Sequence, residues 1–249
     1  MNANKRDGLN TLLTQTANRI SDAYNVLGHD QGWSFLYTPG STLHKGARFL
    51  FMGLNPGGEG TREAVELTTE GGNAYHPDVE NDWLGNGQPS PLQLQVVSFY
   101  SLLADRMNLL DARRVMDESL AANFCPFRSK SWEELKERNK TIAFCEDLWK
   151  DLLLSTQITT IVCMSSIVRK HMSSLIVEAG GKFLREASHR VEWGNVTYSV
   201  SQFIIDDRNI TMVCLPHLSR YRIFGREKSS SAANAIVDTV VSSLGDWRP

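Results

Sequence analysis

The chain has 249 residues, 41% of them hydrophobic, and a formal net charge of −2. This length and composition suffice for one large domain with a substantial core, and the near-neutral charge argues against a globally basic nucleic-acid-binding protein. No run of about 18 apolar residues occurs, and the polar start of the chain is unlike a signal peptide. We therefore expect a cytoplasmic protein without a membrane partner.

The first half of the chain predicts two strands and two helices separated by a long polar stretch. A helix is expected over 10–27 from its apolar spacing, and a buried strand over 47–54 from an apolar run that stops at Asn-Pro-Gly. Residues 57–91 are polar and rich in glycine, which predicts a long excursion of functional interest. A helix over 92–108 and a strand over 119–127 follow.

The second half predicts three strands and three helices. Ser131 is expected to cap a helix that starts at Trp132, with Glu134 in the capping-box position. The remaining expected elements, in chain order, are a strand over 158–164, a helix over 166–179, strands over 195–205 and 209–215, and a helix over 230–244.

Apolar strands that alternate with helices indicate a single α/β domain over residues 1–249. We expect three layers, with a central, mainly parallel sheet flanked by helices. Ligands bind such sheets outside the carboxyl ends of the strands. This rule points to Asn55, to the segment 123–128 and to the segment 217–221.

The four cysteines, Cys125, Cys145, Cys163 and Cys214, are widely spaced, and none forms a C-x-x-C pair. Zinc sites and iron–sulfur clusters use closely spaced ligands of that kind. The sequence therefore predicts reduced, buried thiols and no metal or other cofactor.

The stretch FMGLNPGGEG, residues 51–60, invites a phosphate-binding interpretation. Gly53 and Gly58 have the spacing of a P-loop, but Glu59 and Gly60 stand where lysine and serine or threonine are required. The dinucleotide pattern fails as well, because Glu63 replaces its third glycine. A nucleotide hydrolase is therefore disfavoured.

Three strand ends remain, with the sequences GLNPGG (53–58), NFCPF (123–127) and PHLSRYRIFG (216–225). Together and in this order they resemble the motifs of the uracil-DNA glycosylase superfamily, in which Asn-Pro-Gly is typical of the mismatch-specific and single-strand-selective branches. The cluster-containing branches do not fit, since no cysteine precedes Cys125.

The resemblance implies a monofunctional glycosylase that hydrolyses the bond between a flipped-out base and its deoxyribose. Asn55 would position the attacking water, and His217 would donate a hydrogen bond to the departing base. Asn123 offers a donor and an acceptor that suit the Watson–Crick edge of a pyrimidine. The other residues expected at the substrate are Gly53, Leu54, Pro56, Gly57, Gly58, Tyr75 and Phe124.

The implied partner is DNA, and we expect a monomeric chain that binds it through a local basic region rather than through net charge. The segment from Leu218 to Tyr221 would enter the duplex as the base flips out, with arginines near phosphates. The residues expected to contact DNA are Arg128, Lys130, Leu218, Ser219, Arg220, Tyr221 and Arg222.

The glycines after Asn55 stand where the related uracil enzymes carry a bulky residue, which leaves room for a substituent on C5 of the base. In this the chain is similar to the phage-defence branch that excises glucosylated 5-hydroxymethylcytosine, our leading substrate hypothesis. Polar residues of the excursion could bind such an adduct: Glu59, Arg62, Asn73, Tyr75, Asp78 and Asn81.

Two alternatives stay open. One is a repair enzyme for uracil or another damaged pyrimidine. The other is a non-catalytic module of the same fold that binds DNA or a protein.

Overall fold

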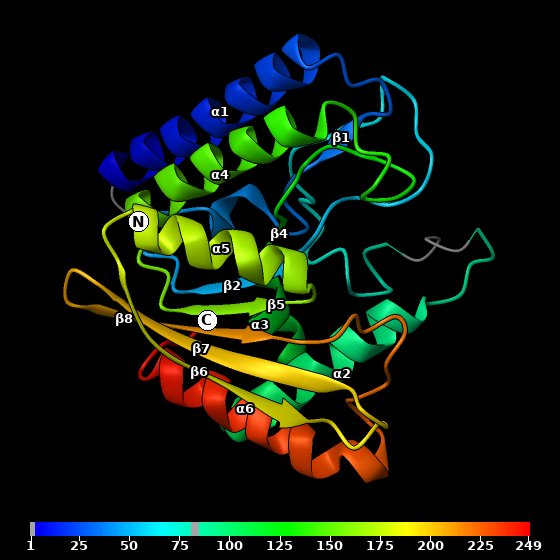
Figure 1. Cartoon of the computed structure of the whole chain (residues 1–249), viewed down its shortest axis with the longest axis vertical. Coiled ribbons are helices and arrows are strands. Elements are labelled where there is room, and N and C mark those ends of the chain that lie inside the picture. Colours follow the sequence, from blue (N-terminus) through cyan, green and yellow to red (C-terminus); the bar gives the residue numbers. More distant parts are fainter. Residues whose placement is uncertain (1–2, 81–84) are drawn as a thin grey trace.

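The fold was analysed in a computed structural model that describes residues 3–80 and 85–249, the side chains of 3–10 excepted. Its centre is a six-stranded sheet (Figure 1). In chain order the strands are β2 (Phe49–Gly53), β4 (Leu120–Asn123), β5 (Thr160–Cys163), β6 (Lys182–Arg190), β7 (Thr197–Ile205) and β8 (Arg208–Cys214).

The strands lie side by side in the order β4-β2-β5-β8-β7-β6. The first four are parallel, whereas β7 runs antiparallel to both of its neighbours. Two short strands, β1 (Trp33–Ser34) and β3 (Val65–Glu66), pair apart from this sheet. The expected α/β architecture with a mostly parallel sheet between helices is confirmed.

Helices cover both faces of the sheet, as Figure 1 shows. One face carries α1 (Ala3–Val26), α4 (Arg138–Ser155) and α5 (Ser166–Glu178). The other carries α2 (Pro91–Arg106), α3 (Ala112–Asp117) and α6 (Ser230–Leu244), while the short helices η1 (Gly40–Thr42) and η2 (Glu227–Ser229) lie in connections. Because β2 is covered on both sides, its side chains alternate between two cores: Leu50 faces one and Phe51 the other.

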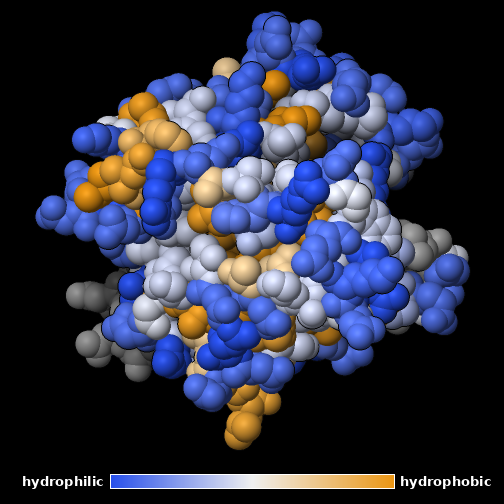
Figure 2. Space-filling model, turned by 60° about the horizontal axis from the view of Figure 1, so that its bottom comes forward, coloured by the Kyte–Doolittle hydropathy of each residue, from blue (hydrophilic) through white to orange (hydrophobic). Residues whose placement is uncertain are grey.

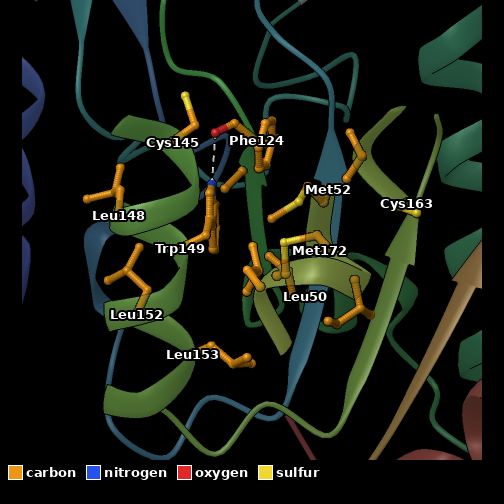
Figure 3. Packing of buried hydrophobic residues seen from close by; sticks show 14 of the residues in the cluster. Leu50, Met52, Phe124, Cys145, Leu148, Trp149, Leu152, Leu153, Cys163 and Met172 are labelled. Carbon is orange, nitrogen blue, oxygen red and sulfur yellow. Dashed lines mark hydrogen bonds between the residues drawn. The ribbon is translucent and has the colours of Figure 1, made fainter. Parts of the chain in front are cut away.

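The core beneath α4 and α5 reaches the carboxyl edge of the sheet, where Trp149 lies (Figure 3). Its indole Nε1 donates a hydrogen bond of 2.9 Å to the carbonyl oxygen of Phe124. A buried donor of this kind needs a partner, so the bond ties the segment after β4 to helix α4.

The predicted start of the long helix is wrong. Ser131 does not cap a helix: its Oγ donates to the carboxylate of Glu134, and α4 begins only at Arg138. Trp132 is buried in the core, and Glu137 adopts a left-handed conformation with φ of 46°. The residues between therefore form turns, because packing and this backbone kink outweigh the capping pattern.

Strand β6 and helix α3 were not expected from the sequence. All nine residues of β6 are exposed, so the strand has no apolar alternation that would reveal it. It exists because it pairs with β7 along the edge of the sheet. The other predicted helices and strands are confirmed, but α1 begins seven residues before the predicted start of its helix, and β4 ends four residues before the predicted end of its strand.

Most of the molecular face seen in Figure 2 is hydrophilic, with apolar side chains in separate small patches. Among the residues that the structure describes, no helix is long and apolar enough to cross a membrane.

Candidate functional site

The first site residue lies at the point where the sheet reverses its strand order. From β2 the chain moves to β4 at one edge of the sheet, whereas from β5 it moves to β6 at the opposite edge. The carboxyl ends of β2 and β5 therefore mark the topological switch point, the usual ligand position in such sheets. Asn55 lies two residues after the end of β2, at this point.

Asn55 is held in one orientation by two hydrogen bonds. Its Nδ2 donates to the carbonyl oxygen of Pro56 (3.1 Å) and to Oγ of Ser129 (2.9 Å). A carbonyl oxygen can only accept, so the atom facing it must be the amide nitrogen. Oδ1 of the half-buried Asn55 therefore remains an acceptor, and no described residue donates to it.

The turn after Asn55 is open on its outer side. A Cβ placed at Gly57 or Gly58 would meet nothing within 4 Å, and Gly58 requires glycine because its φ is +81°. Arg128 fixes the turn by donating from Nη1 to the carbonyl oxygen of Gly57 (2.7 Å). Lys130 pairs with Glu59 at 3.0 Å on the exposed surface.

Asn123, at the end of β4, lies directly beside Gly53 in register with it. A Cβ on residue 53 would come within 2.6 Å of Asn123 Oδ1 and 3.3 Å of the Tyr75 hydroxyl, so only glycine fits there. Asn123 is 2% exposed, and its Nδ2 has no hydrogen-bond partner among the described residues. A buried, unsatisfied donor is costly and is typical of a ligand position.

Two stacked tyrosines line this amide. The rings of Tyr37 and Tyr75 lie 5.2 Å apart with an interplanar angle of 20°, and the hydroxyl of Tyr37 lies near the Asn123 side chain. Burial raises the pKa of both hydroxyls, which are therefore neutral. We name Gly53, Tyr37, Tyr75 and Asn123 the amide cluster.

Tyr75 reaches the amide cluster because Asn73 anchors the excursion to helix α3. Asn73 Nδ2 donates to the carbonyl oxygen of Met116 (3.1 Å), and Asn73 Oδ1 accepts from the backbone of Tyr75 (3.0 Å). The backbone of Asn73 also donates to Asp117 (2.7 Å). A polar residue expected at a ligand is thus a fully buried support for an aromatic one.

The other polar residues of the excursion do not join the amide cluster. Arg62 donates to Asn25 and lies over the ring of Tyr24, and Asp78 contacts Arg113. Asn81 lies outside the described residues.

His217 follows β8 and is exposed on the same edge of the sheet. Its Nδ1 accepts a hydrogen bond of 3.3 Å from the backbone N–H of Ser219 and lies 2.7 Å from Ser219 Oγ. Since a backbone N–H can only donate, the proton of the neutral ring is on Nε2. Partial desolvation, and then the charge of Arg220, lower the pKa of His217 and favour this neutral form.

A cavity of about 370 Å³ lies beside His217, on the α5 side of the sheet edge. Neither Asn55 nor Asn123 lines it. We name it the hydroxyl cavity after five of its lining residues, Ser165, Ser166, Ser188, Thr197 and Ser199.

The segment after His217 is clamped by one buried side chain, Gln95 of α2. Its Oε1 accepts from the backbone of Ile223 (2.7 Å) and Phe224 (2.9 Å), and its Nε2 donates to the carbonyl oxygen of Phe224 (2.7 Å). Leu218 is 1% exposed and packs in the core below α2 and α6, so the expected insertion of this side chain into DNA is not supported. Ser219, Arg220 and Arg222 are exposed and Tyr221 is half-buried.

Three expected substrate residues have structural roles instead. Phe124 is fully buried and its ring stacks on His171 at 5.3 Å. Leu54 packs against the core below α4 and α5, and Pro56 is buried and accepts the Asn55 amide. The sequence in turn missed Ser129, Tyr37 and Gln95, whose partners are distant in the chain and leave no local pattern.

Within residues 3–80 and 85–249, no group of three or more His, Cys, Asp or Glu side chains is arranged to hold a metal ion. The chain matches no protein-family model and no curated protein sequence. The site must therefore be interpreted from its own geometry.

Proposed function

We propose that this chain is a monofunctional DNA glycosylase that acts on a flipped-out, modified pyrimidine. The observation that carries the proposal is the Nδ2 of Asn123, a buried amide donor without a partner beside Tyr75 and a glycine that makes room for it. Such an amide can pair with the Watson–Crick edge of a pyrimidine, and the neighbouring aromatic ring gives a face for stacking.

The order of the parallel strands also supports this function. The candidate base-reading amide follows β4, and His217 follows β8, three strand spacings away. This separation is roughly 14 Å between strand axes, which an amide, a pyrimidine and an imidazole together can span. Asn55 lies after β2, between those two strands.

The proposed reaction breaks the C1′–N bond, whose electron pair leaves with the base, while a water oxygen bonds to C1′ and its proton passes to solvent. Oδ1 of Asn55 accepts a hydrogen bond from the attacking water. Nε2–H of the neutral His217 donates to the base as negative charge develops on it. An oxocarbenium-like sugar needs little activation of the nucleophile, so an amide suffices.

The substrate we favour carries a bulky substituent on C5, such as glucosylated 5-hydroxymethylcytosine in phage DNA. The open space outside Gly57 and Gly58 supports this choice, because a bulky side chain there would close the position. DNA binding would use the exposed Arg220 and Arg222, which have no carboxylate partner in the described part of the chain.

The test incubates the purified protein with DNAs that carry uracil, 5-hydroxymethylcytosine or its glucosylated form, and measures alkali-sensitive strand cleavage. We expect cleavage of the glucosylated DNA, lost in Asn55→Ala and reduced about 100- to 1,000-fold in His217→Gln. Asn209→Ala, an exposed asparagine at the opposite end of β8, is the matched control and should retain activity.

Cleavage of uracil DNA alone would reassign the enzyme to repair. If wild-type protein binds DNA but leaves no abasic site in any of the three, the glycosylase proposal fails and a binding module remains.

A further inference from the structure

The tip of the β6–β7 hairpin, residues 191–196, is fastened to the segment that follows His217. Nη1 of Arg226 donates to the carbonyl oxygen of Glu192 (3.2 Å), and the Arg226 guanidinium lies over the ring of Trp193, 4.0 Å from its centroid. No sequence pattern connects these two regions, because β6 was not predicted.

The tip is held rigidly although it lies at the surface. Val191 is fully buried in the core below α2 and α6, and its N–H donates to the carbonyl oxygen of Val196 (3.1 Å). Arg226 also donates to Ser229 (3.1 Å). Trp193 nevertheless remains 36% exposed, so a large ring that could have been buried is kept accessible to solvent.

Arg226 lies over this ring, and further cations stand in the two chain stretches that meet there. In the described chain none of the following cations forms an ion pair with a carboxylate: Arg190, Arg220, Arg222, Arg226 and Lys228. The stretches 190–193 and 220–228 carry only two acids, Glu192 and Glu227. An exposed aromatic ring among unpaired cations matches the chemistry of nucleic-acid strands, which offer phosphates and stackable bases.

The hydroxyl cavity lies between His217 and the strands that lead to this tip. Its lining includes His217 and Tyr221 on the one hand, and on the other Ser188 of β6 and Thr197, the first residue of β7. Hydroxyl groups can hydrogen-bond to the sugar–phosphate backbone without reading sequence. Trp193 lies four residues before Thr197, at the tip beyond this side of the cavity.

We propose that Arg190, Trp193 and Arg226 form a second DNA contact, which holds the strand flanking the flipped nucleotide. Trp193 stacks with an unpaired base of that strand, and the two arginines contact its phosphates. The inference rests on the proposed function, since it assumes that DNA is the ligand at His217.

The first experiment measures the affinity of wild-type and variant protein for a fluorescein-labelled single-stranded oligonucleotide by anisotropy. Trp193→Ala should weaken binding about 5- to 150-fold, the usual effect of losing one stacking platform. Trp193→Phe keeps an aromatic face and should recover most of the affinity. Thermal melting of each variant verifies the fold.

The second experiment compares two cations on the same exposed strand. Arg190→Gln should reduce the slope of log affinity against log salt by about 0.7, the effect of one lost phosphate contact on single strands. Lys182→Gln lies eight residues away, about 26 Å along β6, and should leave the slope unchanged.

The two proposals fail separately. If wild-type protein binds DNA and excises bases while Trp193→Ala and Arg190→Gln bind as tightly as wild type, the second contact is overturned and the glycosylase remains. If wild-type protein neither binds DNA nor leaves abasic sites, the proposed function is overturned, and the second contact with it. Should Trp193→Ala fail to fold, the salt slope of Arg190→Gln decides.

Discussion

Gly53 and Asn123 are cross-strand neighbours, and the side chain of one occupies the space that the other leaves empty. Asn123 Oδ1 lies 2.6 Å from the position of a Cβ on residue 53, closer than two non-bonded atoms can approach. Gly53 has the spacing of a phosphate-binding turn, but in the structure its missing side chain leaves room for the candidate base-reading amide of Asn123.

Gly53→Ala should therefore displace Asn123 and abolish excision, with a loss of stability of about 1–3 kcal/mol from overpacking. Gly71→Ala is the matched control, because Gly71 is exposed and its Cβ would meet only Val79 at 3.7 Å, an ordinary contact. Of the two variants, Gly53→Ala should have the lower melting temperature and the lower rate of base release. Equal behaviour of the two would contradict the role assigned to the amide cluster.

Ser129 orients Asn55 without reaching the reaction itself. Ser129→Ala removes the 2.9 Å bond to Nδ2 and should slow excision up to about tenfold, in line with roughly 0.5–1.5 kcal/mol for one hydrogen bond. Ser129→Thr keeps the hydroxyl and should restore the rate. Single-turnover kinetics with saturating protein measure the effect, and a Ser129→Thr rate as low as that of Ser129→Ala would argue for packing instead.

The protonation of His217 should set the acid limit of activity. Its pKa is lowered below the ordinary value of 6.5, so the ring is neutral at pH 7 and becomes charged only as the pH falls through the lowered pKa. Activity should be constant above that pKa and decline below it. The neutral ring is also the form that folding favours, so His217 contributes stability above pH 6.5 and loses it as the pH falls.

Arg220→Gln removes the nearest positive charge and should raise the pKa of His217 toward 6.5, moving the acid decline to higher pH. An NMR titration of the ring measures this directly. Arg222→Gln removes a neighbouring exposed charge that does not act on the ring and should leave the pKa in place.

Gln95 should control the order of the segment that carries His217. Gln95→Ala leaves the backbone N–H groups of Ile223 and Phe224 without their acceptor, which costs at least about 2 kcal/mol of folding stability. Gln95→Glu keeps the acceptor and should cost less. Hydrogen exchange at these two amides should accelerate more in the alanine variant; equal exchange in both would mean that other contacts hold the segment.

The order of strands and helices followed from the sequence where apolar periodicity was strong. The apolar runs that became β2 and β5 have no solvent-facing side, so their hydrophobicity is continuous and easily recognised. Strand β6 was not predicted, because an exposed edge strand carries no such pattern. The helix start predicted at Ser131 was wrong, because the buried Trp132 and the left-handed Glu137 decide where α4 begins.

The candidate site, like the fold, was predicted from the sequence only in part. The sequence alone determined that Asn55, Asn123 and His217 follow strands of one parallel sheet, because strand ends and turn residues are local properties. Only the tertiary structure decided which side chains support them: Ser129 on Asn55, Tyr37 and Tyr75 at Asn123, and Gln95 behind His217. It also buried Leu218 and brought Trp193 against Arg226. These contacts join residues far apart in the chain, and their distances are set by the packing of helices on the sheet, which no local pattern encodes.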